Sequence, residues 1–356
     1  MIFNSSLVEY HYVSDDSTHF IDRKKQIEQS LSIINRCESF LIVGERGVGK
    51  TSLLKQIQKE LKNDKSKILP IYISFSDGMF IKTEPKAVIY QILSSLIIYI
   101  WKDILRLNLT DLYSSDNITK VKKSKLSKHT LKAYRLIHTQ YRELIRKDHF
   151  EIETNMFLKG TTGRNTDINS HLEPLYYNEL ISLFCELCDE LKKQIHCESI
   201  VFLCDEANLL NPQLQFDIAQ GLGAVFSSIK YSFVYVVSMS IINNIANEFK
   251  SVFQHEILLE GFQDEEYSKQ LILKRIIDKN RIVISEDVFP LIHKLSRGVP
   301  RYIIELMYHA IIKYEKDCFK DEIIKITTND IYDAYDIQKQ RELKYAKMYA
   351  NMLNET

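Results

Sequence analysis

The segment that begins at Gly44 places glycines, a lysine and hydroxyl side chains at a fixed spacing. Its sequence is Gly44-Glu45-Arg46-Gly47-Val48-Gly49-Lys50-Thr51-Ser52, which contains the phosphate-binding pattern G-x-x-x-x-G-K-T. The glycines let backbone N–H groups converge on phosphates, Lys50 would reach the β- and γ-phosphates, and the Thr51 hydroxyl would bind Mg²⁺. The sequence therefore predicts a nucleotide site over Gly44–Ser52, with Mg²⁺ as its metal.

The surrounding elements fit this assignment. An apolar run at 40–43 suits a buried strand, and after Lys50 the apolar residues follow helical spacing, at Leu53, Leu54, Ile57 and Leu61. A strand, a glycine-rich loop and a helix N-terminus together form an anion site, because the helix dipole adds partial positive charge. No N-K-x-D base-reading motif is present, so ATP is expected rather than GTP.

A second run, Ser199–Glu206, is apolar until it ends in two carboxylates. Uninterrupted apolar character is typical of a strand buried in a parallel sheet, and nucleotides bind at the carboxyl end of such strands. Asp205 is therefore expected to hold Mg²⁺. Glu206 is expected to act as the general base that deprotonates the attacking water.

Composition limits the class of protein. The 356 residues are 45% hydrophobic and 26% charged, as in ordinary globular proteins, and the formal net charge is zero. No global electrostatic attraction to nucleic acid or membrane follows. The first residues have no basic or long apolar leader, and the most apolar window, 87–104, is interrupted by polar side chains. A cytoplasmic protein without membrane contact is expected.

The six cysteines include Cys185 and Cys188, with His196 and Cys197 nearby. This grouping is a weak zinc signal. The helical spacing of apolar residues over 177–193 favours a second interpretation, in which both thiols are small apolar groups on the buried face of a helix.

The order of elements predicts an α/β fold with a parallel sheet and helices on both faces. Residues 1–261 are expected to form a P-loop ATPase domain with a helical, basic insertion at about 85–195. Only helices are expected from Asp264 onward, so 262–356 would be an all-helical lid domain with a C-terminal helix.

The insertion carries a concentration of positive charge. Residues 111–148 hold ten Lys/Arg against four Asp/Glu, and five lysines lie between Lys120 and Lys128. With aromatic and histidine side chains interleaved, the segment could bind nucleic acid through phosphates and base stacking. A solvated basic helix face explains the same composition.

These motifs together resemble AAA+ ATPases of the branch that holds the origin-recognition and archaeal initiator ATPases, with STAND switch ATPases close to it. Phe20–Arg23 resembles the F-x-x-R segment that packs near the adenine, which implies a role for Arg23 at the cofactor. Ser238, after Val236-Val237, lies where the family places sensor 1, with Ser240 and Asn243 as alternatives. Gly298-Val299-Pro300-Arg301 resembles sensor 2, whose arginine reaches the γ-phosphate.

The chain departs from that pattern in two places. Asn247–Ser251, where related initiators carry an arginine finger, contains only Lys250 as a cation, and the 36 residues after Lys320 are too few for a winged helix. Two hypotheses follow. The chain is an Mg²⁺-dependent ATPase that assembles on or loads something onto nucleic acid. Alternatively, it is a nucleotide-gated switch that binds a protein partner or its own copies and hydrolyses ATP slowly, with a phage-defence complex as one setting.

Overall fold

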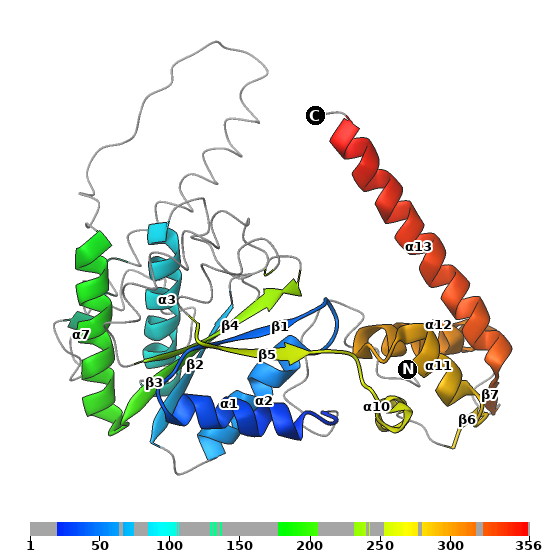
Figure 1. Cartoon of the computed structure of the whole chain (residues 1–356), viewed down its shortest axis with the longest axis horizontal. Coiled ribbons are helices and arrows are strands. Elements are labelled where there is room, and N and C mark those ends of the chain that lie inside the picture. The colour runs from blue at the N-terminus through cyan, green and yellow to red at the C-terminus, as the bar shows by residue number, and fades with distance from the viewer. Residues whose placement is uncertain are drawn as a thin grey trace. The chain divides into compact units, whose positions relative to one another are not determined.

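Residues 40–259 contribute the strands of a five-stranded sheet in this computed structural model (Figure 1). The structure describes residues 20–63, 67–74, 85–104, 106, 129–130, 132–133, 136, 177–205, 231–239, 242, 253–276, 280–317 and 323–354. The strands follow the order β2-β3-β4-β1-β5. Their bounds are β1 Phe40–Gly44, β2 Ile68–Ser74, β3 Ser199–Asp205, β4 Ser232–Ser238 and β5 His255–Leu259.

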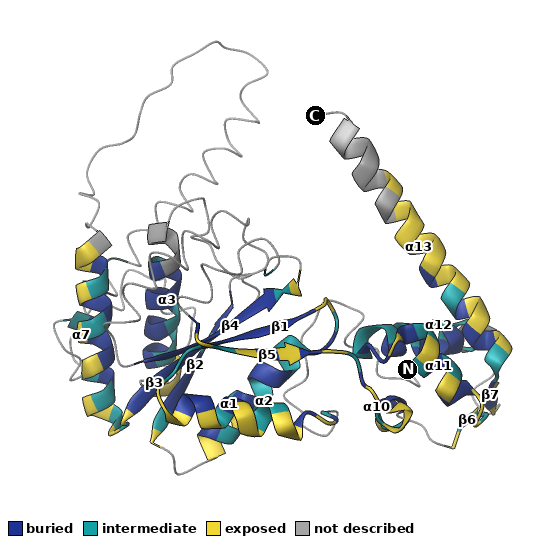
Figure 2. Cartoon of the chain, in the orientation of Figure 1, coloured by how far each residue is buried: buried dark blue, intermediate teal, exposed yellow. Residues whose placement is uncertain are grey.

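Burial explains why these apolar runs become strands of a parallel sheet. All residues of β1 and β3 are buried, and in β4 only the terminal Ser238 is partly exposed (Figure 2). β2 pairs with β3 in parallel, with Ile68 opposite Ser199, and β3 pairs with β4 in parallel, with Val201 opposite Ser232. Strands covered on both faces need apolar side chains at every position. The predicted P-loop sheet is confirmed.

The helices of this part are α1 (Lys24–Asn35), α2 (Lys50–Asn63), α3 (Pro85–Tyr99) and α7 (Tyr177–Ile195). α3 is followed directly by a π-helix at Ile100–Ile104. α7 packs on α3 and on β3. Its predicted apolar face is buried, and the Phe184 and Phe202 rings lie 5.4 Å apart between α7 and β3.

The C-terminal region, which the sequence predicts to be a lid and which is called the lid below, contains α10 (Glu265–Arg275), α11 (Val288–Ser296), α12 (Pro300–Asp317) and α13 (Thr328–Asn354). The expectation of helices alone is wrong in one respect. Ile282–Ile284 (β6) and Ile324–Ile326 (β7) form a parallel two-stranded sheet. Each strand has three residues, with outer isoleucines on one face and a central exposed residue, and so short an alternation does not stand out against helical periodicity.

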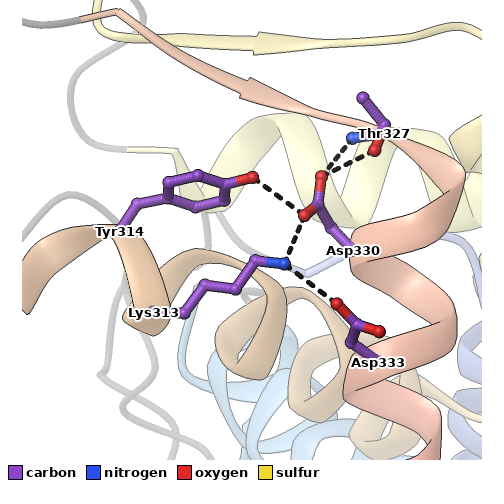
Figure 3. A network of polar contacts seen from close by, with 5 residues as sticks. All are labelled: Lys313, Tyr314, Thr327, Asp330 and Asp333. Atoms are coloured by element: carbon purple, nitrogen blue, oxygen red, sulfur yellow. Dashed lines mark hydrogen bonds and ion pairs between the residues drawn. The ribbon is translucent and has the colours of Figure 1, made fainter. Parts of the chain in front are cut away.

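A carboxylate fixes the start of α13 against the end of α12 (Figure 3). Asp330 accepts hydrogen bonds from the Thr327 backbone N–H (2.7 Å), the Thr327 hydroxyl (2.8 Å) and the Tyr314 hydroxyl (2.8 Å), and it pairs with Lys313. Lys313 also donates to Asp333 at 3.2 Å. Thr327 and Asp330 have the spacing of a capping box. This motif lies where the chain leaves β7 and begins α13.

Two compact units divide the chain. One holds the described residues of 1–30, 42–57 and 257–356, and the other those of 31–41 and 58–256. The loop after β1, the segment before α1 and the lid helices therefore belong to a single unit. Among the described helices, none combines the length and apolar character that a membrane crossing requires.

Candidate nucleotide-binding site

The loop between β1 and α2 has the backbone that the P-loop motif predicts. Gly47 and Gly49 have φ values of 93° and 100°, a region that side chains with a Cβ rarely enter. A Cβ on Gly44 would lie 2.5 Å from the Leu259 carbonyl oxygen, so this glycine allows close approach to β5. Glycine is thus required at Gly47 and Gly49 for conformation and at Gly44 for space.

Lys50, the first residue of α2, folds its ammonium group back into this loop. Its Nζ donates to the carbonyl oxygens of Gly44 (2.7 Å) and Glu45 (2.8 Å). Thr51 and Ser52 follow in the first turn, partly exposed, and no acidic residue lies in that turn. The helix N-terminus and the ammonium place positive potential where an anion would bind.

The predicted sensor 2 residue lies directly against the P-loop. The Arg301 backbone N–H donates to the Gly47 carbonyl at 3.3 Å. A Cβ on Gly47 would lie 2.8 Å from Arg301 Cβ and 3.3 Å from its Cδ, so the arginine stem covers this glycine. The structure therefore brings together the glycine loop and the first turn of α12, two segments about 250 positions apart.

Charged groups surround the start of α12. Burial raises the pKa of Glu305, one helical turn beyond Arg301, and the nearby guanidinium groups of Arg301, Arg341 and Arg46 oppose that shift. Arg46 belongs to the P-loop and Arg341 to α13. Three arginines, from the P-loop, α12 and α13, thus lie near Glu305, and arginine is the side chain that best matches phosphate oxygens.

Arg23 also lies beside the P-loop, with its guanidinium turned into the protein. The residue is 7% exposed, and its Nη2 donates to the carbonyl oxygens of Val48 (3.4 Å) and Glu260. The guanidinium carbon lies 5.3 Å from the centre of the Phe262 ring. The sequence indicated that Arg23 belongs to this site, and the contacts are to backbone and an aromatic ring.

Asp205 and Ser238 belong to the second unit, at the carboxyl ends of the neighbouring strands β3 and β4. Asp205 is 1% exposed, and the Tyr72 hydroxyl donates to its Oδ2 at 2.6 Å. Parallel strands bring their carboxyl ends to one edge of the sheet, so both predicted residues lie on the edge where nucleotides bind in such folds.

Sequence reasoning missed Tyr72. Its signal is a polar aromatic residue between Ile71 and Ile73 in an otherwise apolar strand, two positions before Ser74, which pairs with Asp205. Several predicted positions lie outside the described residues: the proposed base Glu206, the alternatives Ser240 and Asn243, the basic segment Lys120–Lys128, and Asn247–Ser251.

The cysteines considered as zinc ligands lie on α7. Cys188 is fully buried and Cys185 is half-buried, and burial raises the pKa of both thiols. Within the described residues, no group of three or more His, Cys, Asp or Glu side chains is arranged to hold a metal ion.

Comparison with known protein families identifies the fold. The model of the KAP family P-loop domain matches residues 23–257. Because the match covers more than half of the chain, the chain belongs to this family of P-loop proteins. No curated protein matches the sequence.

Solved structures resemble the chain at low sequence identity. The Aeropyrum pernix Orc1 protein, solved in complex with DNA, has 13% identity and a TM-score of 0.51, and the match covers 93% of this chain and 68% of Orc1. A RuvB variant from Thermotoga maritima has 14% identity and a TM-score of 0.39, with 89% and 70% covered. The predicted likeness to initiator-type P-loop ATPases is confirmed at the level of fold.

Proposed function

We propose that this KAP-family chain binds and hydrolyses ATP in a Mg²⁺-dependent manner, and that its lid responds to the bound nucleotide. The observation that carries the proposal is the contact of Arg301 with Gly47 inside the P-loop. A guanidinium at this position is well placed to pair with a terminal phosphate, and it belongs to a helix of the lid. Nucleotide state would thereby be linked to lid conformation.

Each predicted site residue has a separate role at the phosphates. The P-loop N–H groups of Gly44–Ser52 would surround the β-phosphate, and Lys50 would exchange its two loop carbonyls for phosphate oxygens. Arg301 would neutralise charge on the γ-phosphate. Glu206 would accept a proton from the attacking water, and Ser238 would orient that water.

Mg²⁺ suits the oxygen donors that the sequence provides, the Asp205 carboxylate and the Thr51 hydroxyl. Tyr72 supports this assignment, since its bond at 2.6 Å orients the buried carboxylate. When bound, the metal would neutralise charge that develops on the phosphates.

A role on nucleic acid is the next part of the proposal. The segment Lys120–Lys128 supplies a dense positive charge in a chain of zero net charge. The DNA in the Orc1 structure belongs to that protein, and it makes DNA the first ligand to test here. The chain would then act as an assembly or loading factor.

The absence of arginine in Asn247–Ser251 favours the second candidate, a nucleotide-gated switch that hydrolyses ATP slowly. In that case the partner of the lid or insertion is a protein, or a second copy of this chain.

ATP binding is tested by replacing Lys50. Loss of a charge-assisted hydrogen bond worth about 1.5–3 kcal/mol should weaken ATP binding by about ten- to hundredfold. Equilibrium titration with a fluorescent ATP analogue measures this for Lys50→Ala. Lys59→Ala, the same change at an exposed position of α2, is the control and should bind like the parent. Equal affinity of Lys50→Ala and the parent would refute the P-loop assignment.

A further inference from the structure

The residues before α1 connect the core of the lid with the P-loop. Ile21 is 7% exposed and packs in the lid core, in one cluster with Phe262, Ile272 and Ile303. Two positions later, Arg23 turns toward the P-loop. The same short segment is therefore held in the lid at one residue and on the glycine loop at another.

Arg23 makes three contacts with segments far apart in the sequence. One is the carbonyl of Val48, inside the P-loop, and another is the carbonyl of Glu260, 237 positions away where β5 leads into the lid. The third is the face of the Phe262 ring, over which the guanidinium carbon lies in a cation–π contact.

Because Arg23 is buried, the loss of any of these contacts would be energetically costly. Burial lowers the pKa of the Arg23 guanidinium, and the carboxylates of Asp22 and Glu260 oppose this. An arginine keeps its charge nonetheless, so the loss of a partner would leave an uncompensated buried cation. The backbone is also strained, since Asp22 and Arg23 have φ values of 60° and 73°. Residues persist in this region only when their surroundings hold them there.

Phe262 also contacts the turn that precedes α12. Its backbone N–H donates to the Gly298 carbonyl at 2.8 Å. A Cβ on Gly298, whose φ is 67°, would lie 2.1 Å from the Phe262 carbonyl oxygen, so the two backbones touch. Gly298 leads through Val299 into α12, where Arg301 contacts Gly47.

These contacts close a ring. It runs from Arg23 to Val48 in the P-loop, through Gly47 to Arg301, back along the chain to Gly298, across to Phe262, and again to Arg23. Val48 and its neighbour Gly47 are therefore connected to the lid at two points, through Arg23 and through Arg301.

We propose that Arg23 is a positioning residue that couples the P-loop to the lid, so that a phosphate on the loop changes the stability of α11 and α12. The proposal rests on the proposed ATP binding, because nucleotide is the ligand that would displace the loop. Coupling of this kind requires that ATP favour one arrangement of the ring over another.

The test compares hydrogen exchange of α11 and α12 backbone amides with and without Mg²⁺-ATP, in the full chain. In the parent, ATP should slow exchange in both helices. Arg23→Lys keeps the charge, places the donor nitrogen one bond further from the Val48 and Glu260 carbonyls, and replaces the guanidinium over the Phe262 ring. The ATP concentration that saturates each variant is determined by titration, and at saturation Arg23→Lys should lose the ATP-dependent slowing in α11 and α12.

Controls separate coupling from folding and from ATP binding. Arg36→Lys makes the same change at an exposed position and should keep the full ATP effect. If Arg23→Lys does not fold, Phe262→Leu replaces it, because this change removes the ring beneath the guanidinium and leaves an apolar side chain in the lid core. The ATP-dependent slowing should then fall by at least about half.

The outcomes are distinguishable. A parent that fails to bind ATP refutes the proposed function. A parent that binds ATP without any change in α11 and α12 overturns the coupling alone. The coupling is also overturned if Arg23→Lys shows the same ATP-dependent slowing of exchange in α11 and α12 as the parent. The same holds for Phe262→Leu if that variant has to replace Arg23→Lys.

Discussion

At the residue scale, the Tyr72 hydroxyl orients the carboxylate that we propose as a Mg²⁺ ligand. Asp205 is almost fully buried, at the end of a strand without an exposed side chain, and Tyr72 donates to one of its oxygens. An ionised carboxylate in such surroundings needs hydrogen bonds. The partner of a ligating carboxylate also determines its orientation.

Tyr72→Phe should therefore weaken Mg²⁺-dependent binding without removing the site. The ring and its packing remain, and the hydrogen bond to Asp205 is removed. Loss of a partner of a metal ligand typically weakens metal affinity by about tenfold or more. The measurement is the Mg²⁺ concentration that half-saturates binding of a fluorescent ATP analogue, repeated with Mn²⁺ by electron paramagnetic resonance.

Tyr231→Phe is the matched control for this variant. Its hydroxyl donates to Asp189 on α7 at 3.0 Å, so it too loses a tyrosine–aspartate bond. We expect a change in thermal stability and no change in the Mg²⁺ requirement. Identical Mg²⁺ curves for Tyr72→Phe and Tyr231→Phe would show that Tyr72 has only a structural role.

At the scale of elements, the contact between the end of α12 and the start of α13 depends on the Asp330 carboxylate. Burial opposes ionisation of Asp330, but the hydrogen bonds from Lys313, Thr327 and Tyr314 outweigh it and hold the pKa of Asp330 below its usual value. A lowered pKa means that this stabilisation is fully present above the unfolded pKa, about 4, and is lost as the pH falls through the folded pKa.

Asp330→Asn should lower the free energy of unfolding of the lid by about 2–4 kcal/mol at neutral pH, because Lys313 and the capping groups lose their charged acceptor. Denaturant unfolding followed by circular dichroism measures the change. The difference from the parent should shrink as the pH falls below about 4, because Asp330 becomes neutral in the parent as well.

Asp333→Asn tests whether another acidic neighbour of Lys313 contributes as much to stability as Asp330 does. The Asp333 side chain is 68% exposed, and its bond to Lys313 is longer, at 3.2 Å. Exposed ion pairs contribute about 0–1 kcal/mol. A loss for Asp333→Asn as large as that for Asp330→Asn would contradict the assignment of this contact between α12 and α13 to Asp330.

The elements that could be predicted from the sequence are those whose periodicity or motif is long enough to read. β3, α7 and the loop before Lys50 are of this kind. β6 and β7 could not be predicted, because they have three residues each and their pairing joins Ile282 to Ile324 across 42 positions. The contacts of Arg23 with Val48 and Glu260 were hidden for the same reason, since no local pattern encodes a tertiary contact.

At the scale of the whole molecule, charge is unevenly distributed along a chain whose net charge is zero. The five lysines of Lys120–Lys128 are concentrated in nine residues. The lid ends in α13, whose distal half is exposed where its side chains are described (Figure 2). The proposed nucleic-acid role depends on the first of these features, and a protein partner could use either.

Replacement of Lys120, Lys122, Lys123, Lys125 and Lys128 by Gln separates the two candidate functions. If these side chains bind phosphates, nucleic-acid affinity should fall at low salt. The slope of log affinity against log salt should also flatten, by about 0.9 for each phosphate of duplex DNA that the variant no longer neutralises. ATP binding should stay unchanged, because the P-loop is a separate segment. Fluorescence anisotropy with labelled DNA and RNA, over a salt series and with ATP present, measures both quantities.

The control removes the same charge from the lid. Five exposed lysines, Lys294, Lys325, Lys339, Lys344 and Lys347, are replaced by Gln. If binding followed total charge alone, both variants would lose the same affinity. If the insertion is the binding segment, the lid variant keeps most of the salt slope. A parent that binds neither DNA nor RNA at low salt would exclude the nucleic-acid role. The nucleotide-gated switch would then remain, with a protein as its partner, because ATP binding and the lid response do not depend on the lysines of the insertion.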